Sequence, residues 1–269
     1  MKGSHGSFKA VPMRPFSVRL AQAVGFLSRL PVPQRYFDGV EEAPLAEASD
    51  TFALAGLVIA LPAIVALLFA SLIWPSGIAA IVALATLVAV TGALHEDGLA
   101  DCADAFFGGN DTERRLTIMK DSRIGTFSAL ALIVQFAACW AALAAIHQQL
   151  GVVAAAVALI AAAMLSRSAI VWHWYHLPSA RPDGLAASQG QPDRSSFSRS
   201  TLTAGTVSAI LIAWRFGLGA TMVTLVAAAA LALASATLAR AKIGGHTGDT
   251  LGMTQKVVEA AVLLALASA

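Results

Sequence analysis

Apolar stretches that come in closely spaced pairs, separated by longer polar segments, make up most of this chain. The pairs are residues 51–74 with 77–94, 125–146 with 152–171, and 201–214 with 216–239. Both members of the first pair are long enough to cross about 30 Å of hydrocarbon, whereas the first member of the third pair is short. The pattern predicts three tight hairpins of membrane-spanning helices.

The two ends of the chain add to this pattern. Phe16, Leu20, Val24 and Leu27 recur at helical spacing, with Arg19 and Gln22 off that stripe, which predicts an amphipathic helix over 16–30 in the interface plane. An apolar tail, 257–269, is about half a normal span. We therefore expect an all-α integral membrane protein, a polytopic bundle of six or seven transmembrane helices with an N-terminal interfacial helix.

Composition supports a membrane protein. The chain is 57% hydrophobic and 13% charged, whereas a soluble domain carries about 25% charged residues. The net charge of +2 provides no basic field that would recruit nucleic acid. Residues 1–15 lack the apolar core of a signal peptide, so we expect a disordered tail followed by a single membrane-embedded catalytic domain over 16–269.

The distribution of charge predicts an orientation. Of the 18 lysines and arginines, only Arg215 falls in a loop on the far side, while Arg167 is expected to snorkel from a helix end. The other sixteen lie in segments that the hairpins bring to one face, and nearly all acids accompany them, with Glu259 as the exception. The excess of positive charge predicts that this face is cytoplasmic.

An acidic cluster follows the second apolar stretch. If the segment is helical, the steps between Asp97, Asp101 and Asp104 bring all three carboxylates to one face. Mg²⁺ is the natural partner, because it prefers carboxylate oxygens and leaves room for phosphate. His95, just before the cluster, is a candidate for orienting substrate or moving a proton.

Two further motifs point to phosphate. Residues 118–126 read Ile-Met-Lys-Asp-Ser-Arg-Ile-Gly-Thr and offer the two cations Lys120 and Arg123. Residues 244–252 read Gly-Gly-His-Thr-Gly-Asp-Thr-Leu-Gly, a predicted loop whose amides can approach an anion while Asp249 reaches a metal.

Two rival classes share some of these features. A cation-coupled transporter is disfavoured, because the acids cluster at one end of the spans and not near the midplane where transporters bind. A CDP-alcohol phosphotransferase also uses a multi-aspartate motif, but its consensus places an arginine after Asp-Gly-x-x-Ala, where this chain has Asp101.

The closer resemblance is to the adenosylcobinamide-GDP ribazoletransferase family, the membrane-bound cobalamin synthases. It is carried by Phe-Leu-Ser-Arg-Leu-Pro-Val-Pro at 26–33, by His-x-Asp-Gly-Leu-Ala-Asp-x-x-Asp at 95–104, and by the two motifs at 118–126 and 244–252. These segments run from near the N-terminus to near the C-terminus. Ser28 stands where threonine is usual and Ser128 where glycine often follows Thr-Phe.

The resemblance implies a Mg²⁺-dependent reaction in the bacterial cytoplasmic (inner) membrane. A hydroxyl of α-ribazole, or of its 5′-phosphate, attacks adenosylcobinamide-GDP and GMP leaves. The general base stays open among Asp104, Asp121 and His95. The remaining implied roles are metal binding and substrate binding. Metal ligands are Asp97, Asp101, Asp104 and Asp121; substrate contacts are Arg29, Lys120, Ser122, Arg123, Thr247, Gly248 and Asp249. Whether the chain forms a homo-oligomer or docks other cobalamin-assembly enzymes is left open.

Overall fold

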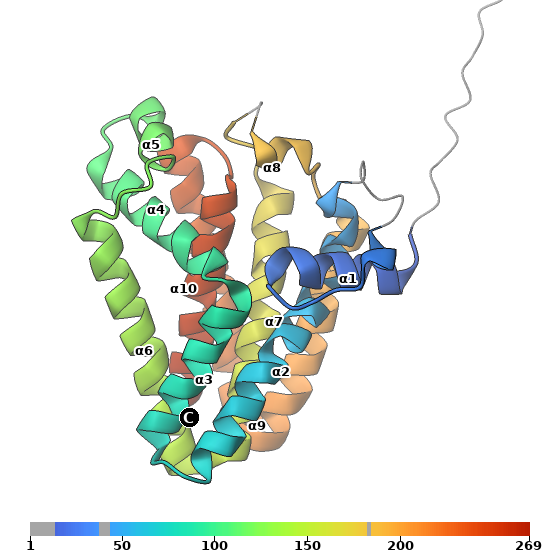
Figure 1. The fold of residues 1–269 in the computed structure, drawn as a ribbon, viewed down its shortest axis with the longest axis vertical. Helices are drawn as coiled ribbons and strands as arrows, with labels where there is room; N and C mark the ends of the chain where they lie inside the picture. Colours follow the sequence, from blue (N-terminus) through green and yellow to red (C-terminus); the bar gives the residue numbers. More distant parts are fainter. Residues whose placement is uncertain (1–13, 38–43, 182–183) are drawn as a thin grey trace, which may run out of the picture.

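The computed structural model describes residues 14–37, 44–181 and 184–269, and helices dominate this part of the chain (Figure 1). The α-helices are α1 (Phe16–Leu27), α2 (Phe52–Ser71), α3 (Ser76–Thr91), α4 (Leu94–Gly108), α5 (Thr112–Ile118), α6 (Thr126–Leu150), α7 (Val152–His176), α8 (Leu185–Ser188), α9 (Arg194–Ile243) and α10 (Gly248–Ala267). Two 3-10 helices, η1 (Gln34–Tyr36) and η2 (Leu45–Thr51), precede α2. The predicted all-α membrane bundle is confirmed.

In the part of the chain that the structure describes, five helices are long and apolar enough to cross a membrane, and up to six if the bent pair α3–α4 forms one span. One of the five, α9, contains 50 residues and breaks at Gly217, where φ is 88° and ψ is 169°. That backbone conformation is nearly exclusive to glycine. The chain reverses at this residue, so that α9 descends along the bundle in its first arm and returns in its second (Figure 1). If the two halves of α9 on either side of Gly217 are counted as separate spans, the described residues form six membrane-spanning segments, or seven with the bent pair α3–α4.

The final helix differs from its prediction. The sequence indicated an apolar tail of half a span beginning at 257, but α10 starts at Gly248 and is long enough to cross. Its N-terminal half buries Thr250, Thr254 and Gln255, because α10 packs against α4, α6, α7 and α9 in the middle of the bundle. A hydropathy pattern underestimates the length of such a helix, because its polar side chains are surrounded by protein and not by lipid.

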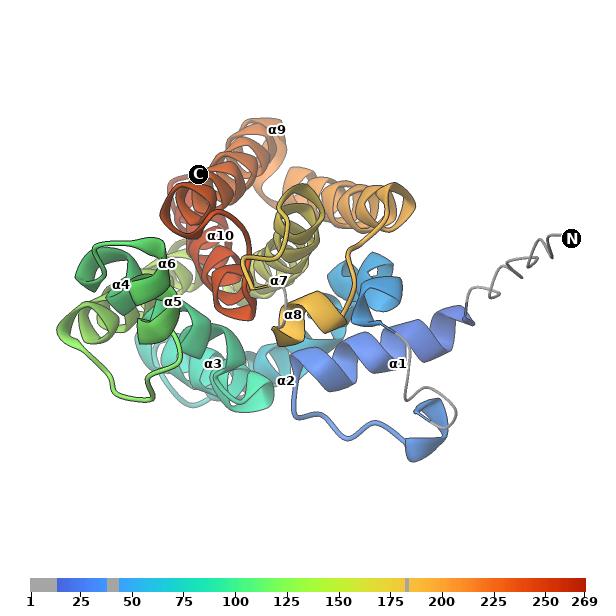
Figure 2. The same ribbon diagram turned by 90° about the horizontal axis from the view of Figure 1, so that it is seen from above.

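The helix α1 lies across one end of the bundle, over α2 and η2 (Figure 2). It ends at Leu27, three residues before the predicted boundary. Arg19, expected on the polar face, is only 7% exposed, and its Nη2 atom lies 2.9 Å from Oδ2 of Asp50 in η2. The ion pair makes burial of Arg19 tolerable and fastens α1 to the bundle. Of the predicted disordered tail 1–15, only Arg14 and Pro15 fall within the described residues.

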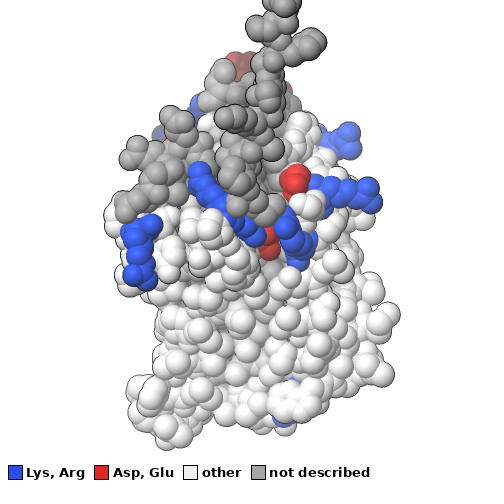
Figure 3. Space-filling model, turned by 90° about the vertical axis from the view of Figure 1, so that its right-hand side faces the viewer, with Lys and Arg blue, Asp and Glu red and all other residues white. Residues whose placement is uncertain are grey.

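Charged side chains gather at the end of the bundle that carries α1, α4, α5 and α8, while the rest of the visible surface is almost free of charge (Figure 3). Arg215 lies at the opposite end, where it donates a hydrogen bond to the Leu150 carbonyl at the end of α6. Arg167 does not snorkel: it is 1% exposed inside the bundle, where the negative charges of Glu259 in α10 and Glu96 in α4 act on it electrostatically.

Candidate active site

A sharp bend places the acidic helix across the charged end of the bundle. The helices α3 and α4 meet at 88°, and the backbone at Gly92 (φ 63°) and Ala93 (φ 58°) is left-handed. The left-handed backbone at Gly92 favours glycine, and a Cβ atom there would lie 2.7 Å from Nε of Arg29, whose side chain would have to shift. The bend takes α4 out of the spanning direction and turns its acids toward the neighbouring α10. Arg29 covers the bend and does not line the pocket described below.

Two glycines then allow α4 and α10 to touch. A Cβ atom at Gly98 would lie 2.7 Å from the carbonyl oxygen of Asp249, and one at Gly252 would lie 3.4 Å from the Cα atom of Gly98. Backbones can approach this closely only where both helices lack side chains. The contact brings Asp97 and Asp101 of α4 close enough to Asp249 of α10 for their charges to interact.

The glycine-rich motif is a loop only over residues 244–247, as predicted, and from Gly248 onward it forms the beginning of α10. Thr247 caps α10: its Oγ1 accepts from the Thr250 N–H at 3.3 Å, while Thr250 Oγ1 accepts from the Thr247 N–H at 2.9 Å. His246 is fixed to the segment after α7, because its N–H donates to the Pro178 carbonyl at 2.8 Å. This reciprocal capping presents Gly248 and Asp249 at a positive helix end.

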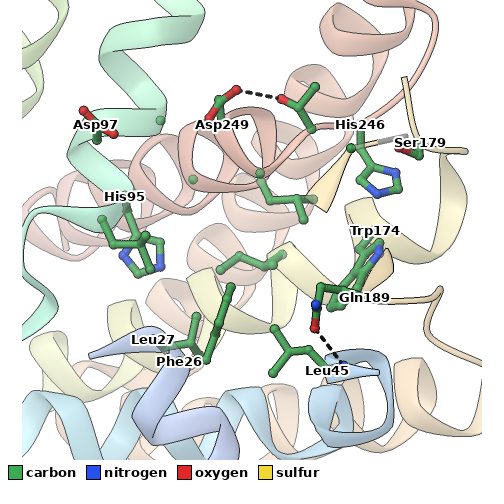
Figure 4. Close-up of a pocket in the computed structure, with 18 of the residues that line it drawn as sticks. Phe26, Leu27, Leu45, His95, Asp97, Trp174, Ser179, Gln189, His246 and Asp249 are labelled. Carbon is green, nitrogen blue, oxygen red and sulfur yellow. Dashed lines mark hydrogen bonds between the residues drawn. The ribbon is translucent and has the colours of Figure 1, made fainter. Parts of the chain in front are cut away.

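A pocket with a volume of about 290 Å³ lies between α1, α4, α7 and the start of α10 (Figure 4). One wall is polar and the other is apolar. The polar wall includes His95, Asp97, Arg181, His246, Thr247, Gly248 and Asp249; the apolar wall includes Phe26, Leu27, Leu45, Phe52, Ile170, Trp174 and Leu251. Of the predicted site residues, His95, Asp97, Thr247, Gly248 and Asp249 line this pocket.

The crowded carboxylates favour a positive partner. Burial, together with the neighbouring charges of Asp249, Asp97 and Asp104, raises the pKa of Asp101 to about 7, although Arg181 acts in the opposite direction. A cation bound among these groups would restore the ionised form.

The donor chemistry fits Mg²⁺. Within residues 14–37, 44–181 and 184–269, no three His, Cys, Asp or Glu side chains are grouped closely enough to hold a metal ion unaided. Mg²⁺ rarely needs such a cage, because it usually binds one or two carboxylates, several waters and the phosphates of a substrate. Asp97, Asp101 and Asp249 provide carboxylates of that kind.

His95 is buried within the polar wall. It is 3% exposed, and its Nε2 atom has no hydrogen-bond partner among the described residues. Burial, followed by the nearby positive charges of Arg167 and Lys256, lowers the pKa of His95 well below its usual value. This shift favours the neutral imidazole, whose unpartnered ring nitrogen is free to take part in a hydrogen bond.

Asp104 does not face the pocket. Its carboxylate accepts hydrogen bonds from the N–H groups of Gly125 (2.6 Å) and Ser128 (3.1 Å) and from the Ser128 hydroxyl. Burial raises its pKa, but these hydrogen bonds outweigh burial and lower the pKa below its usual value. A Cβ atom at Gly125 would lie 2.5 Å from this carboxylate. Asp104 thus connects α4 to the N-terminus of α6.

The motif at 118–126 also lies outside the pocket. Asp121 is bound by Arg123, whose Nε donates to Oδ1 at 2.9 Å, and the hydrogen bonds from Arg123 lower the pKa of Asp121 to about 2. Lys120 and Ser122 are exposed. The structure therefore does not bring together the four predicted metal ligands: Asp97 and Asp101 share one region, whereas Asp104 and Asp121 have other partners.

Arg181 is the functional candidate that the sequence did not reveal. Among the described pocket-lining residues it is the one arginine or lysine, and it acts electrostatically on Asp101 and Asp249. Its Nη2 atom donates a hydrogen bond to the Leu116 carbonyl at 2.8 Å. Its buried Nε atom has no hydrogen-bond partner among the described residues. A single arginine in a proline-containing loop carries no pattern, so only its position in the fold identifies it.

Fold and site together define a polytopic membrane protein with an acid-lined pocket at the charged end of its bundle. The chain belongs to the cobalamin-5-phosphate synthase (CobS) family, whose sequence profile matches residues 19–267.

Relatives in several bacteria share this sequence over nearly its whole length. The chain is 48% identical to a Rhizobium etli protein over 258 residues, which is 96% of this chain and 99% of the relative. It is 47% identical to a Rhizobium meliloti protein (93% of this chain, 96% of the relative) and 44% identical to one from Brucella ovis (92% and 95%). All three are named adenosylcobinamide-GDP ribazoletransferase. No solved structure matches the chain.

Proposed function

We propose that this chain transfers the adenosylcobinamide phosphate group from adenosylcobinamide-GDP to α-ribazole or its 5′-phosphate. A hydroxyl of the acceptor attacks the phosphorus on the cobinamide side, a new P–O bond forms, and the P–O bond to GMP breaks. The products are GMP and adenosylcobalamin or its 5′-phosphate. The observation that carries the proposal is the contact between Gly98 and Gly252, which places the carboxylates of two helices beside one arginine in a single pocket.

The reaction is Mg²⁺-dependent in this proposal. Asp97, Asp101 and Asp249 would hold the ion, which supplies charge neutralisation for the diphosphate when bound. Burial and, after it, the neighbouring carboxylates raise the pKa of Asp101, and this supports the assignment because a bound cation would offset both effects.

The chain's own residues would provide the remaining chemistry. Of the three candidate bases, only His95 lines the pocket, and its unpartnered Nε2 atom would accept the proton of the attacking hydroxyl. Arg181 would bind phosphate oxygens, since guanidinium groups can bind them bidentately. The N-terminus of α10 at Gly248 would add favourable backbone dipoles for the same anion.

We place the protein in the bacterial inner membrane with this pocket on the cytoplasmic side. The concentration of lysines and arginines at the end that carries the pocket supports this orientation (Figure 3). Both substrates are then available on the side where the polar wall lies.

Product analysis tests the proposal. The purified chain in lipid nanodiscs is incubated with adenosylcobinamide-GDP and α-ribazole 5′-phosphate, with and without Mg²⁺, and GMP and the corrinoid product are identified by mass spectrometry. We expect equal amounts of GMP and adenosylcobalamin 5′-phosphate only when Mg²⁺ is present. An Asp97→Asn/Asp249→Asn variant is expected to release neither. Corrinoid product formed without GMP release, or no product at all from the wild type, would refute the proposal.

A further inference from the structure

A group of four charged residues is buried directly behind the pocket. Glu96 of α4, Lys256 and Glu259 of α10, and Arg167 of α7 contribute two positive and two negative charges. Arg167, Lys256 and Glu259 are 1%, 6% and 2% exposed, and the Glu96 side chain is 16% exposed. None of them lines the pocket, and none contacts substrate or metal in the proposed reaction.

The contacts within this buried group divide it into two parts. Lys256 Nζ lies 2.9 Å from Oε1 of Glu96, which joins α10 to α4. Lys256 also pairs with Glu259, which accepts a 3.3 Å hydrogen bond from Gln255, so this second pair lies within α10. The ion pair between Glu96 and Lys256 is therefore the one that spans the two acid-bearing helices.

The Glu96–Lys256 ion pair lies close to the aspartates of both helices. Glu96 precedes Asp97 in the chain, and Lys256 follows Asp249 by seven residues, about two helical turns. Between the two helices lies the contact of Gly98 with Gly252. Gly98 and Gly252 themselves have no side chains that interlock, and the apolar cluster beside them, which includes Leu99 of α4 and Met253 of α10, provides no directional contact.

A buried ion pair can supply what the glycines lack. Breaking such a pair by removing one partner costs about 3–5 kcal/mol, and fixing the register of helices is the best-supported use of buried polar groups. We propose that the Glu96–Lys256 ion pair sets the register of α4 against α10 and thereby positions Asp97 and Asp101 relative to Asp249. Both are positioning residues, and their link to a cation rests on the function proposed above.

Two neutral double variants separate this role from general stability. Glu96→Gln/Lys256→Met removes one charge of each sign and the tie between the helices. Glu259→Gln/Arg167→Met also removes one charge of each sign from the same buried group but leaves the Glu96–Lys256 ion pair in place. Electroneutrality is preserved in both, so both are expected to fold.

Three measurements in nanodiscs compare the variants with the wild type. One is the Mg²⁺ concentration for half-maximal GMP release, and the second is the Mg²⁺ concentration that produces half of the Mg²⁺-induced rise in Tm. The third is the distance distribution between spin labels at Gly108→Cys and Leu264→Cys, on α4 and α10, measured by pulsed electron paramagnetic resonance. Native Cys102 and Cys139 are buried, so we expect neither to take up label.

For Glu96→Gln/Lys256→Met, we expect both Mg²⁺ midpoints to rise by about tenfold or more, as for residues that orient metal ligands, and the distance distribution to broaden. The control pair keeps the wild-type midpoints and distribution. The single variant Glu96→Gln leaves Lys256 paired with Glu259, and we expect it to raise both Mg²⁺ midpoints by a smaller factor. If the double variant does not fold, this single variant tests the inference in its place. Midpoints and distances equal to those of the control pair overturn the inference. Absence of GMP release from the wild type refutes only the proposed function, because the Tm and distance measurements still test the ion pair.

Discussion

At the scale of single residues, neighbours decide what each aspartate of α4 does. Asp101 faces other carboxylates and is short of positive charge, whereas Asp104 accepts three hydrogen bonds at the start of α6. The sequence predicted that both would lie on one helical face with the same role. Helical periodicity gives the direction of a side chain but not the element it meets, so the partner of Asp104, 21 residues further along the chain, could not be predicted.

The pocket arginine provides a first prediction. Arg181→Ala is expected to raise KM for adenosylcobinamide-GDP by about tenfold or more, since a charge-assisted contact to phosphate is worth about 1.5–3 kcal/mol. Arg181→Lys should recover part of the loss, because lysine keeps the charge but not the bidentate geometry. Steady-state GMP release measures both. Arg123→Ala tests the assignment made from sequence, and a larger effect there than at Arg181 would contradict the structure.

The pKa of Asp101 provides a second prediction. Because this pKa is raised from 3.8 to about 7, the folded protein binds more protons than the unfolded chain between those values, and stability without metal falls as pH rises through that window. Solvent moderates the effect at this half-buried group, so we expect Tm to be about 2–4 °C lower at pH 8 than at pH 5.5.

Thermal unfolding in EDTA checks this pH dependence. Asp101→Asn should reduce it, whereas Asp121→Asn should not, because the pKa of Asp121 is about 2 and this side chain stays ionised throughout the window. A Tm that rises from pH 5.5 to pH 8 in the wild type would contradict the prediction.

At the scale of elements, glycines determine which helices meet. The apolar stretches predicted the spanning helices well, because hydropathy records exposure to lipid. It could not predict that α10 begins at Gly248, since the polar side chains of that helix are buried against protein. Nor could it predict the contact of α4 with α10, which depends on Gly98 and Gly252 having no side chains.

A graded series of alanines tests this contact. Gly98→Ala is expected to abolish most activity and to lower stability by about 1–3 kcal/mol, because its Cβ atom would lie 2.7 Å from the Asp249 carbonyl. Gly252→Ala should lower activity and stability less, since its Cβ atom would lie no closer than 3.4 Å to the nearest atom, the Cα atom of Gly98. Gly108→Ala is the matched control on the same helix, with nothing within 4 Å. GMP release and Tm measure the series, and equal effects at Gly98 and Gly108 would argue against a close helix contact at the site.

At the scale of the whole molecule, the hairpin pattern and the charge asymmetry predicted the bundle and the end that carries the pocket. Arg167 shows the limit of that reasoning. This charge, predicted to lie at a helix end, is buried inside the bundle under the electrostatic influence of Glu259 and Glu96 from two other helices, and no local pattern contains that arrangement.

The orientation of the bundle gives a prediction for intact cells. A cysteine placed at Arg215 should react with a membrane-impermeant maleimide added outside spheroplasts, and a cysteine at Lys120 should react only after the membrane is opened. Both positions lie outside the pocket, so GMP release from membranes can confirm that each variant is folded. The reverse labelling pattern would place the pocket on the periplasmic side.

The polar interior of α10 also bears on how the protein is made. A segment that contains Lys256 and Glu259 partitions poorly into lipid by itself, since each such charge is costly at the centre of a bilayer. Its counter-charges Glu96 and Arg167 are synthesised earlier, on α4 and α7. We therefore expect α10 to enter the membrane only by joining helices that are already inserted, so that the site between α4 and α10 forms as α10 inserts.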